Sequence, residues 1–171
     1  MSLYDASAPQ FRKMLTNLDR WLESATAHAE KKPFDANVLL NARLAPDQFP
    51  LTRQVQSACD AAKFGVARVT GKVAPKNPDT EQTFAELRAR IGTCIAYLDT
   101  FTRADFDGSE ERVLELPSME GKLVTASDYL YQMALANFYF HVTTAYAILR
   151  HNGVPLGKRD FLGPLSAHTK E

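Results

Sequence analysis

The stretch SDYLYQMALANFYFHVTTAYAILRHN, residues 127–152, decides the fold of this chain because its apolar residues surround almost the whole circumference of a predicted helix. Asn152 and Gly153 tolerate the left-handed conformation that ends helices. Asn137, His141 and a pair of threonines interrupt the apolar run, so it does not have the composition of a membrane span. We therefore expect a long helix that is buried on adjacent faces.

Three earlier segments repeat apolar residues every three or four positions, which is the spacing of one helical face. Pro50 opens the second of these segments and Gly71 closes it. Asp79 and Gln82 have the spacing of a capping box before the third. The three helices are expected from Ser7 to about His28, from Pro50 to Gly71 and from Asp79 to Phe101.

Two connections between the helices have features of their own. Residues 34–49 have no sustained period, and a connection of that length usually crosses over a bundle or lines a site, which makes Arg43 a candidate site residue. Before the last helix, Arg112–Leu116 and Lys122–Val124 are short β-compatible runs, so we expect a small hairpin there. The sequence thus predicts one all-α domain over residues 1–171, a four-helix bundle with a long connection between helices one and two.

Composition narrows the classes of partner and compartment. Twenty Lys and Arg balance twenty Asp and Glu, so the chain lacks the basic excess that binds nucleic acid or anionic membranes. No charged, apolar leader precedes Tyr4, and Cys59 and Cys94 fall in separate helices without disulfide or CxxC spacing. We expect a cytoplasmic protein whose two cysteines are small buried side chains.

The polar residues of the last helix are the most informative candidates for chemistry. Asn137 and His141 are four apart and so point the same way, into the bundle. His141 is either a metal ligand or a core histidine that hydrogen-bonds Asn137 or a facing residue. On helix two, Asp60 either supplies a carboxylate to a metal beside His141 or pairs with Lys63 on a solvated face.

Motifs of several common enzyme classes are missing from the sequence. It contains no GxSxG, GxxxxGK[ST], HExxH or GxGxxG run, so acyl transfer, phosphoryl transfer, zincin and dinucleotide chemistry have no motif support. The paired glutamates and ExxH motif of di-iron bundles are also missing.

Several long runs resemble the DinB/YfiT-like superfamily, and specifically an uncharacterised branch of it. They are RLAPD (residues 43–47), FPL (49–51), QVQ (54–56), NFYFH (137–141), AILR (147–150) and GVPLGKRDFLG (153–163). The resemblance implies the DinB-like four-helix bundle. It also implies a divalent metal, zinc or nickel, held by one histidine of helix two and two of the last helix.

The resemblance places the last two histidine positions on Asn137 and His141, and the helix-two position near Gln56 or Ser57. One of three ligands is therefore retained, and an amide oxygen is a weak ligand for zinc or nickel. The expected metal candidates are His141, Asn137 and Asp60, in a degenerate site.

Three hypotheses for function follow. The first is a small-molecule-binding or structural protein, with a pocket beside Arg43, Gln56 and Tyr146. The alternative, implied by the resemblance alone, is a metal-dependent enzyme like the thiol S-transferases. The third is a stress-linked dimeric scaffold. Because the last helix is apolar on adjacent faces, we expect it to form part of a homodimer interface.

Overall fold

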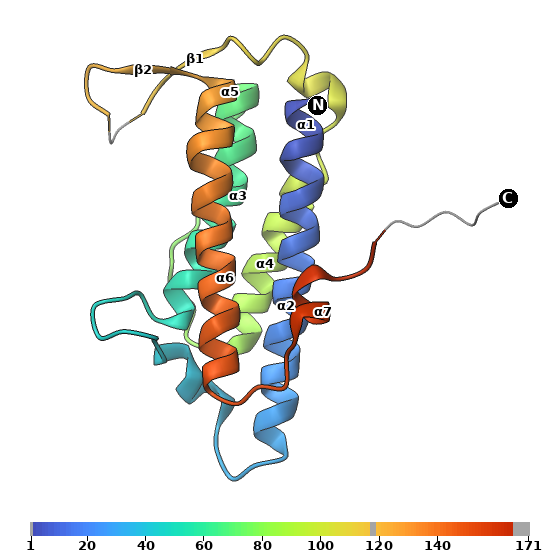
Figure 1. Cartoon of the computed structure of the whole chain (residues 1–171), viewed down its shortest axis with the longest axis vertical. Helices are drawn as coiled ribbons and strands as arrows, with labels where there is room; N and C mark the ends of the chain where they lie inside the picture. The colour runs from blue at the N-terminus through green and yellow to red at the C-terminus, as the bar shows by residue number, and fades with distance from the viewer. Residues whose placement is uncertain (1, 117–118, 166–171) are drawn as a thin grey trace, which may run out of the picture.

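Four long helical segments lie side by side in the computed structural model, which describes residues 2–116 and 119–165 (Figure 1). Helix α2 packs against α4 and α6, and α3 packs against the same two helices. This arrangement confirms the predicted all-α bundle. The segments are α2 (Ala8–Glu30), α3 (Leu51–Thr70), α4 (Phe84–Leu98) and a last helix made of α5 (Ala126–Asp128), η3 (Tyr129–Ala134) and α6 (Leu135–His151).

Helix α2 buries the apolar stripe that its sequence predicted. Ser7 precedes the helix without capping it, because its hydroxyl donates to the carbonyl of Leu3, 2.6 Å away, in the preceding short helix α1 (Leu3–Ala6). The stripe forms the part of the core that α2 contributes. It consists of Phe11, Leu15, Leu18, Leu22 and Ala25, all fully buried.

Helices α3 and α4 begin at the same end of the bundle. The first connection contains the 3₁₀ helix η1 (Ala36–Asn41), where Asn37 Oδ1 accepts a hydrogen bond of 3.1 Å from the backbone of Phe84, the first residue of α4. In the same connection, the carbonyl of Ala42 accepts a hydrogen bond from the backbone N–H of Leu51, the first residue of α3. Residues 71–83 therefore return along the bundle between two helices that run in the same direction (Figure 1).

The start of α4 shows that the capping box predicted at Asp79 and Gln82 is wrong. Thr83 Oγ1 accepts from the backbone of Glu86 at 3.2 Å, and Glu86 Oε2 accepts from the backbone of Thr83 at 3.0 Å. Asp79 instead has a left-handed backbone, with φ of 55°, and its carboxylate binds arginines of α3 and α4. Gly71 ends α3 in the left-handed conformation, as predicted.

The predicted hairpin is present, and the last helix that follows it is not uniform. Strand β1 (Val113–Glu115) pairs antiparallel with β2 (Leu123–Thr125). The six residues of η3 form a π-helical turn, a wider turn that often occurs at functional sites. None of the described helices combines the length and apolar character needed to cross a membrane.

The segment after the last helix packs back onto α2. Helix α7 (Lys158–Leu162) places the Phe161 ring in a stack on Trp21, with ring centroids 5.4 Å apart. Trp21 Nε1 also donates to the carbonyl of Asp160 at 3.1 Å. At the end of the bundle where α1 lies, the short 3₁₀ helix η2 (Arg103–Phe106) contacts α1.

Candidate functional site

His141 is a buried histidine whose proton position is set by its neighbours. Its side chain lies on α6, the residue is 8% exposed, and its Nδ1 is 2.8 Å from Gln54 Oε1 on α3. The amide nitrogen of Gln54 donates to the carbonyl of Phe49 at 3.0 Å, so the amide oxygen is the acceptor toward His141. His141 Nδ1 must then carry the proton, which leaves a lone pair on Nε2.

Burial holds the pKa of His141 below its ordinary value, and the positive charge of Arg53 lowers it further. Removal from water and repulsion from a nearby positive charge both disfavour the charged imidazolium, which explains the direction of the two effects. At neutral pH the ring is therefore neutral, with Nε2 able to accept a hydrogen bond or a proton.

We expect His141 to make the folded protein sensitive to mild acid. Its pKa is lower folded than unfolded, so its contribution to stability is complete above about pH 6.5 and is lost as the pH falls through the folded pKa. Urea unfolding at pH 7.0 and 5.5 measures this. His141→Gln should reduce the loss between the two pH values, while His151→Gln, at an exposed position of the same helix, should keep it. An unchanged loss in His141→Gln would contradict the expectation.

A cavity of about 180 Å³ lies between α3 and the last helix, and His141 lines it. The π-helical turn contributes Tyr129, Met133 and Ala134 to its wall. Nε2 of His141 has no hydrogen-bond partner among the described residues, so this lone pair is free to act in the cavity. The other lining residues are Ser57, Asp60, Ala61, Phe64, Arg68 and Asn137.

The three residues predicted as metal candidates, His141, Asn137 and Asp60, all line this cavity. Asn137 was expected to face the core, but it is exposed and stands at the outer side of the cavity. The histidine donates its hydrogen bond to the facing residue Gln54, which is one of the two arrangements left open for a core histidine. The residues come together, but as parts of a cavity wall.

Asp60 belongs to a set of ion pairs that we call the Arg90 cluster. Its Oδ1 lies 2.8 Å from Lys63 Nζ and 2.8 Å from Arg90 Nη2. The pair with Lys63 was expected on a solvated face, yet the Lys63 side chain is only 3% exposed. The cluster contains three cations and three carboxylates, namely Arg53, Lys63, Arg90, Asp60, Asp79 and Glu81.

Arg90 holds the centre of this cluster. Its side chain is 2% exposed, and Nη1 lies 2.6 Å from Asp79 and 3.1 Å from Glu81. Burial opposes the charged form, but the hydrogen bonds that Arg90 donates to Glu81 and Asp79 prevail and raise its pKa. Burial also opposes the charged acids, yet hydrogen bonds from Arg53 and Arg90 hold the pKa of Asp79 below its ordinary value, and hydrogen bonds from Gln56 and Arg90 do the same for Glu81. Every charge in the cluster is thus matched.

The donor set does not fit a tightly bound divalent metal. Of the three candidates, His141 offers one nitrogen, Asn137 offers a weak amide oxygen, and Asp60 already binds two cations. The position facing His141 on α3 is Gln54, another amide. Among the described residues no three His, Cys, Asp or Glu side chains are grouped as metal ligands would be. The degenerate metal site therefore has the chemistry of a polar cavity.

The residues predicted for a small-molecule pocket lie apart from one another. Arg43 is exposed and donates to the carbonyls of its own loop at Pro46 and Gln48. Gln56 donates to Glu81 of the Arg90 cluster at 2.8 Å. Tyr146 packs edge-on against Trp21 on the α2 side of the bundle, 5.3 Å between ring centroids. None of the three lines the cavity at His141.

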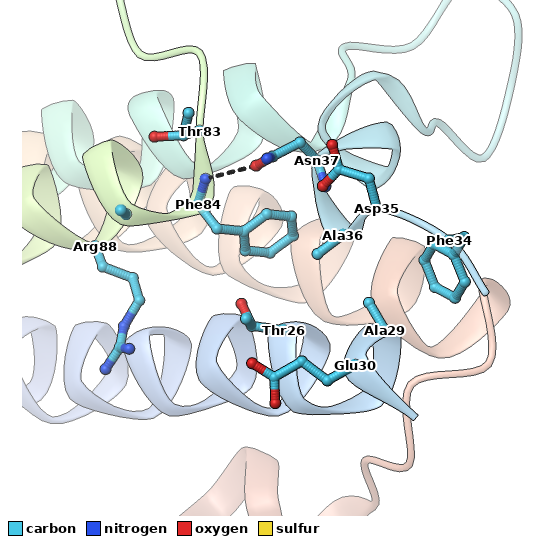
Figure 2. A pocket seen from close by; sticks show the side chains of 11 residues that line it. Thr26, Ala29, Glu30, Phe34, Asp35, Ala36, Asn37, Thr83, Phe84 and Arg88 are labelled. Atoms are coloured by element: carbon cyan, nitrogen blue, oxygen red, sulfur yellow. Dashed lines mark hydrogen bonds between the residues drawn. The ribbon is translucent and has the colours of Figure 1, made fainter. Parts of the chain in front are cut away.

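A larger cavity of about 440 Å³ lies at the end of the bundle where the first connection meets α4 (Figure 2). Phe34 and Phe84 line it, and the figure shows Asn37 bonded to the backbone of Phe84 across it. Its arginine, Arg88, is already paired with Asp19 at 2.8 Å. Of the polar groups of this cavity, Asn37 therefore links the connection to α4, and Arg88 links α4 to α2.

Gln54, Arg68 and Tyr129 are members of the site that the sequence did not single out, whereas Ser57 was named only as a possible position of the missing histidine. On α3, Ser57, Ala61, Phe64 and Arg68 recur at spacings of three and four along one stripe. This stripe was the available signal, but it mixes polar and apolar residues at the edge of the buried stripe and resembles an ordinary partly exposed face. Tyr129 is offset by the π-helical turn and gave no such signal.

The two cysteines are buried on facing helices, as expected. Cys94 Sγ donates to the carbonyl of Cys59 at 3.4 Å. The hydrogen bond with Cys94 raises the pKa of the Cys59 thiol well above its ordinary value, and burial raises it further. A thiol held in this protonated form is a poor nucleophile.

Comparison with known proteins agrees with this fold. A crystal structure of a DinB family member protein from Shewanella denitrificans is 50% identical and superposes with a TM-score of 0.95, covering 98% of this chain and 96% of that one. No curated protein matches the chain. The domain of unknown function DUF1993 matches residues 3–162, almost the whole sequence. The chain therefore belongs to the DUF1993 family and is a DinB-like domain of unknown function.

Proposed function

We propose that this protein binds a small molecule in the cavity between α3 and the last helix, and that His141 Nε2 accepts a hydrogen bond from it. The supporting observation is the chain of contacts from Phe49 through Gln54 to His141, which fixes a neutral ring with a lone pair on Nε2. His141 lines the cavity, and its Nε2 makes no hydrogen bond within the described residues, so it can accept one from a bound molecule. A ligand that carries a hydroxyl or N–H group supplies one.

The cavity is small compared with the sites that hold drug-sized ligands, which occupy about 300–1,000 Å³. At about 180 Å³ it suits a molecule of a few functional groups. The thiol-transfer alternative depends on a bound metal, and the side chains that line this cavity do not fit a tightly bound divalent metal. We therefore propose binding, without a metal-dependent reaction.

Titration with small fragments tests this proposal. In ¹H–¹⁵N NMR spectra of the full chain, fragments that carry a hydroxyl or amide N–H should shift the signals of Ser57, Asn137 and His141. His141→Gln should weaken the binding of the best fragment at least tenfold, which is the effect of losing about 1.4 kcal/mol. His151→Gln should bind normally. If no fragment shifts these signals, or if His141→Gln binds equally well, the proposal is wrong.

We also propose that the outward face of the last helix joins two copies of the chain. Met133 and Phe140 are two helical turns apart on this face, 41% and 54% exposed, and large exposed apolar side chains in one row are typical of an interface. Light scattering after size-exclusion chromatography should give a dimer at micromolar concentration. Phe140→Lys should give a monomer, whereas Phe49→Lys, at an equally exposed position elsewhere, should remain dimeric. A wild-type monomer would refute this second proposal.

A further inference from the structure

Arg68 is held between two aromatic rings at the edge of the α3 cavity. Its guanidinium carbon lies 5.1 Å from the centroid of the Phe64 ring and 5.4 Å from that of Tyr129. Its Nη1 donates to the hydroxyl of Tyr129 at 2.9 Å. These contacts restrict the guanidinium without neutralising it, so the charge is held in a defined place.

The charge balance around the cavity leaves Arg68 in excess. The cations of the Arg90 cluster are matched one for one by its carboxylates, and Asp60, the acid that lines the cavity, is among those already bound. Within residues 2–116 and 119–165, Arg68 has no carboxylate within ion-pair distance. Because His141 is neutral, the cavity carries one net positive charge.

The two ends of the cavity therefore favour different groups. A planar guanidinium binds carboxylates through paired N–H donors, so Arg68 favours an anionic head. The lone pair on His141 Nε2 repels an anion and favours a hydrogen-bond donor. Arg68 binds Tyr129, which lies twelve residues before His141 on the last helix, so the two groups stand at opposite ends of the cavity.

We infer that the ligand of this cavity is a short monocarboxylate with a hydroxyl group at its far end, its carboxylate on Arg68 and its hydroxyl on His141. This inference rests on the proposed function and adds the chemical class of the ligand. A single negative charge matches the single unpaired cation, and the small volume limits the length of the molecule.

The test uses straight-chain ω-hydroxycarboxylates from glycolate to 6-hydroxyhexanoate as probes, each beside its neutral ω-hydroxyamide, with inorganic phosphate as a further anion. Calorimetric or NMR titration of the full chain should show binding of at least one hydroxycarboxylate and at least tenfold weaker binding of the matching amide. Arg68→Gln should weaken the hydroxycarboxylate at least tenfold. Arg43→Gln removes an exposed arginine that contacts only its own loop and should change nothing.

The variants separate the two proposals. The carboxylate assignment is overturned if Arg68→Gln binds the hydroxycarboxylate as well as the wild type does, or if the wild type binds the amide as well as the hydroxycarboxylate. If His141→Gln loses binding in the same experiment, the proposed cavity function stands. Binding of phosphate alone, or of no hydroxycarboxylate, also overturns it. If fragments of every class bind equally to the wild type and His141→Gln, both proposals fail.

Folding of the Arg68 variants is controlled by thermal unfolding, because the side chain packs on Phe64 and Tyr129. Should Arg68→Gln not fold, Arg68→Lys decides the question. It keeps the charge but loses the paired donors, so it should bind the hydroxycarboxylate more weakly than the wild type and still prefer it to the amide. Loss of that preference in folded Arg68→Lys overturns the assignment.

Discussion

Replacing Arg90 with methionine is expected to lower the free energy of unfolding by about 3 kcal/mol, since it removes one partner of a buried set of ion pairs. The Arg90 side chain is 2% exposed and contacts Asp60, Asp79 and Glu81. Without it these carboxylates lose the cation that lies between them. They are themselves 11–32% exposed, which keeps the expected loss at the lower end of the range for buried pairs. Urea unfolding monitored by circular dichroism measures it.

Arg88→Met is the matched control for this change. Arg88 is on the same helix and also binds an acid, Asp19, at 2.8 Å, but its side chain is 37% exposed. Ion pairs of that kind contribute about 0–1 kcal/mol. If the two variants lose stability equally, the burial of Arg90 does not make its ion pairs more stabilising than those of Arg88.

Replacing Phe11 with alanine is expected to cost about 3–5 kcal/mol, the range for truncating a large buried aromatic side chain. Phe11 is fully buried, and the centroid of its ring lies 4.6 Å from the centroid of the Phe138 ring. Phe140→Ala, at a position 54% exposed, should change the free energy of unfolding by less than about 1 kcal/mol in a monomeric sample. Chemical unfolding compares the two, and a cost below about 1 kcal/mol for Phe11→Ala would contradict the packing described.

The same ring explains why α3 has a glycine at its centre. A Cβ atom on Gly65 would stand 2.9 Å from Phe11 Cε2, too close for an unstrained contact. Gly65→Ala alone should therefore cost about 1–3 kcal/mol. In a Phe11→Ala background, where the obstructing ring is gone, the added cost should be smaller. Additive costs would show that the two positions do not share this contact.

The periodic helices could be predicted from the sequence because local signals and packing agree there. The stripe from Phe11 to Ala25 is buried as its spacing required, and Gly71 ends α3 in the left-handed conformation that glycine favours. The hairpin after Gly108 was predicted for the same reason, since its short β-compatible runs have no helical period.

The Arg90 cluster could not be predicted because its partners come from a connection without periodicity. Asp79 was interpreted as a helix cap from local spacing, whereas its carboxylate binds Arg53 and Arg90, far away in sequence. Lys63 was placed on a solvated face by the same local reasoning. Return of residues 71–83 along the bundle brings Asp79 and Glu81 onto the buried Arg90, which is a tertiary effect.

The candidate site was predicted in part for a related reason. His141, Asn137 and Asp60 were identified and line one cavity, since residues at helical spacing share a face. Arg43, Gln56 and Tyr146 were grouped without information on which helices are neighbours, and each contacts a different partner, namely its own loop, Glu81 and Trp21.

The π-helical turn changes the angular phase of the last helix. At about 100° per residue, a regular α-helix would place Tyr129 about 80° away from Asn137 and about 120° away from His141 around its axis. A π turn takes up roughly one extra residue, which reduces both offsets to about 20°. Tyr129, with the Arg68 that it binds, thus shares one azimuth with Asn137 and His141. Deleting a single residue within Leu130–Ala134 would leave Tyr129 seven and eleven residues before these two positions, so the regular α-helix that results would keep the same alignment.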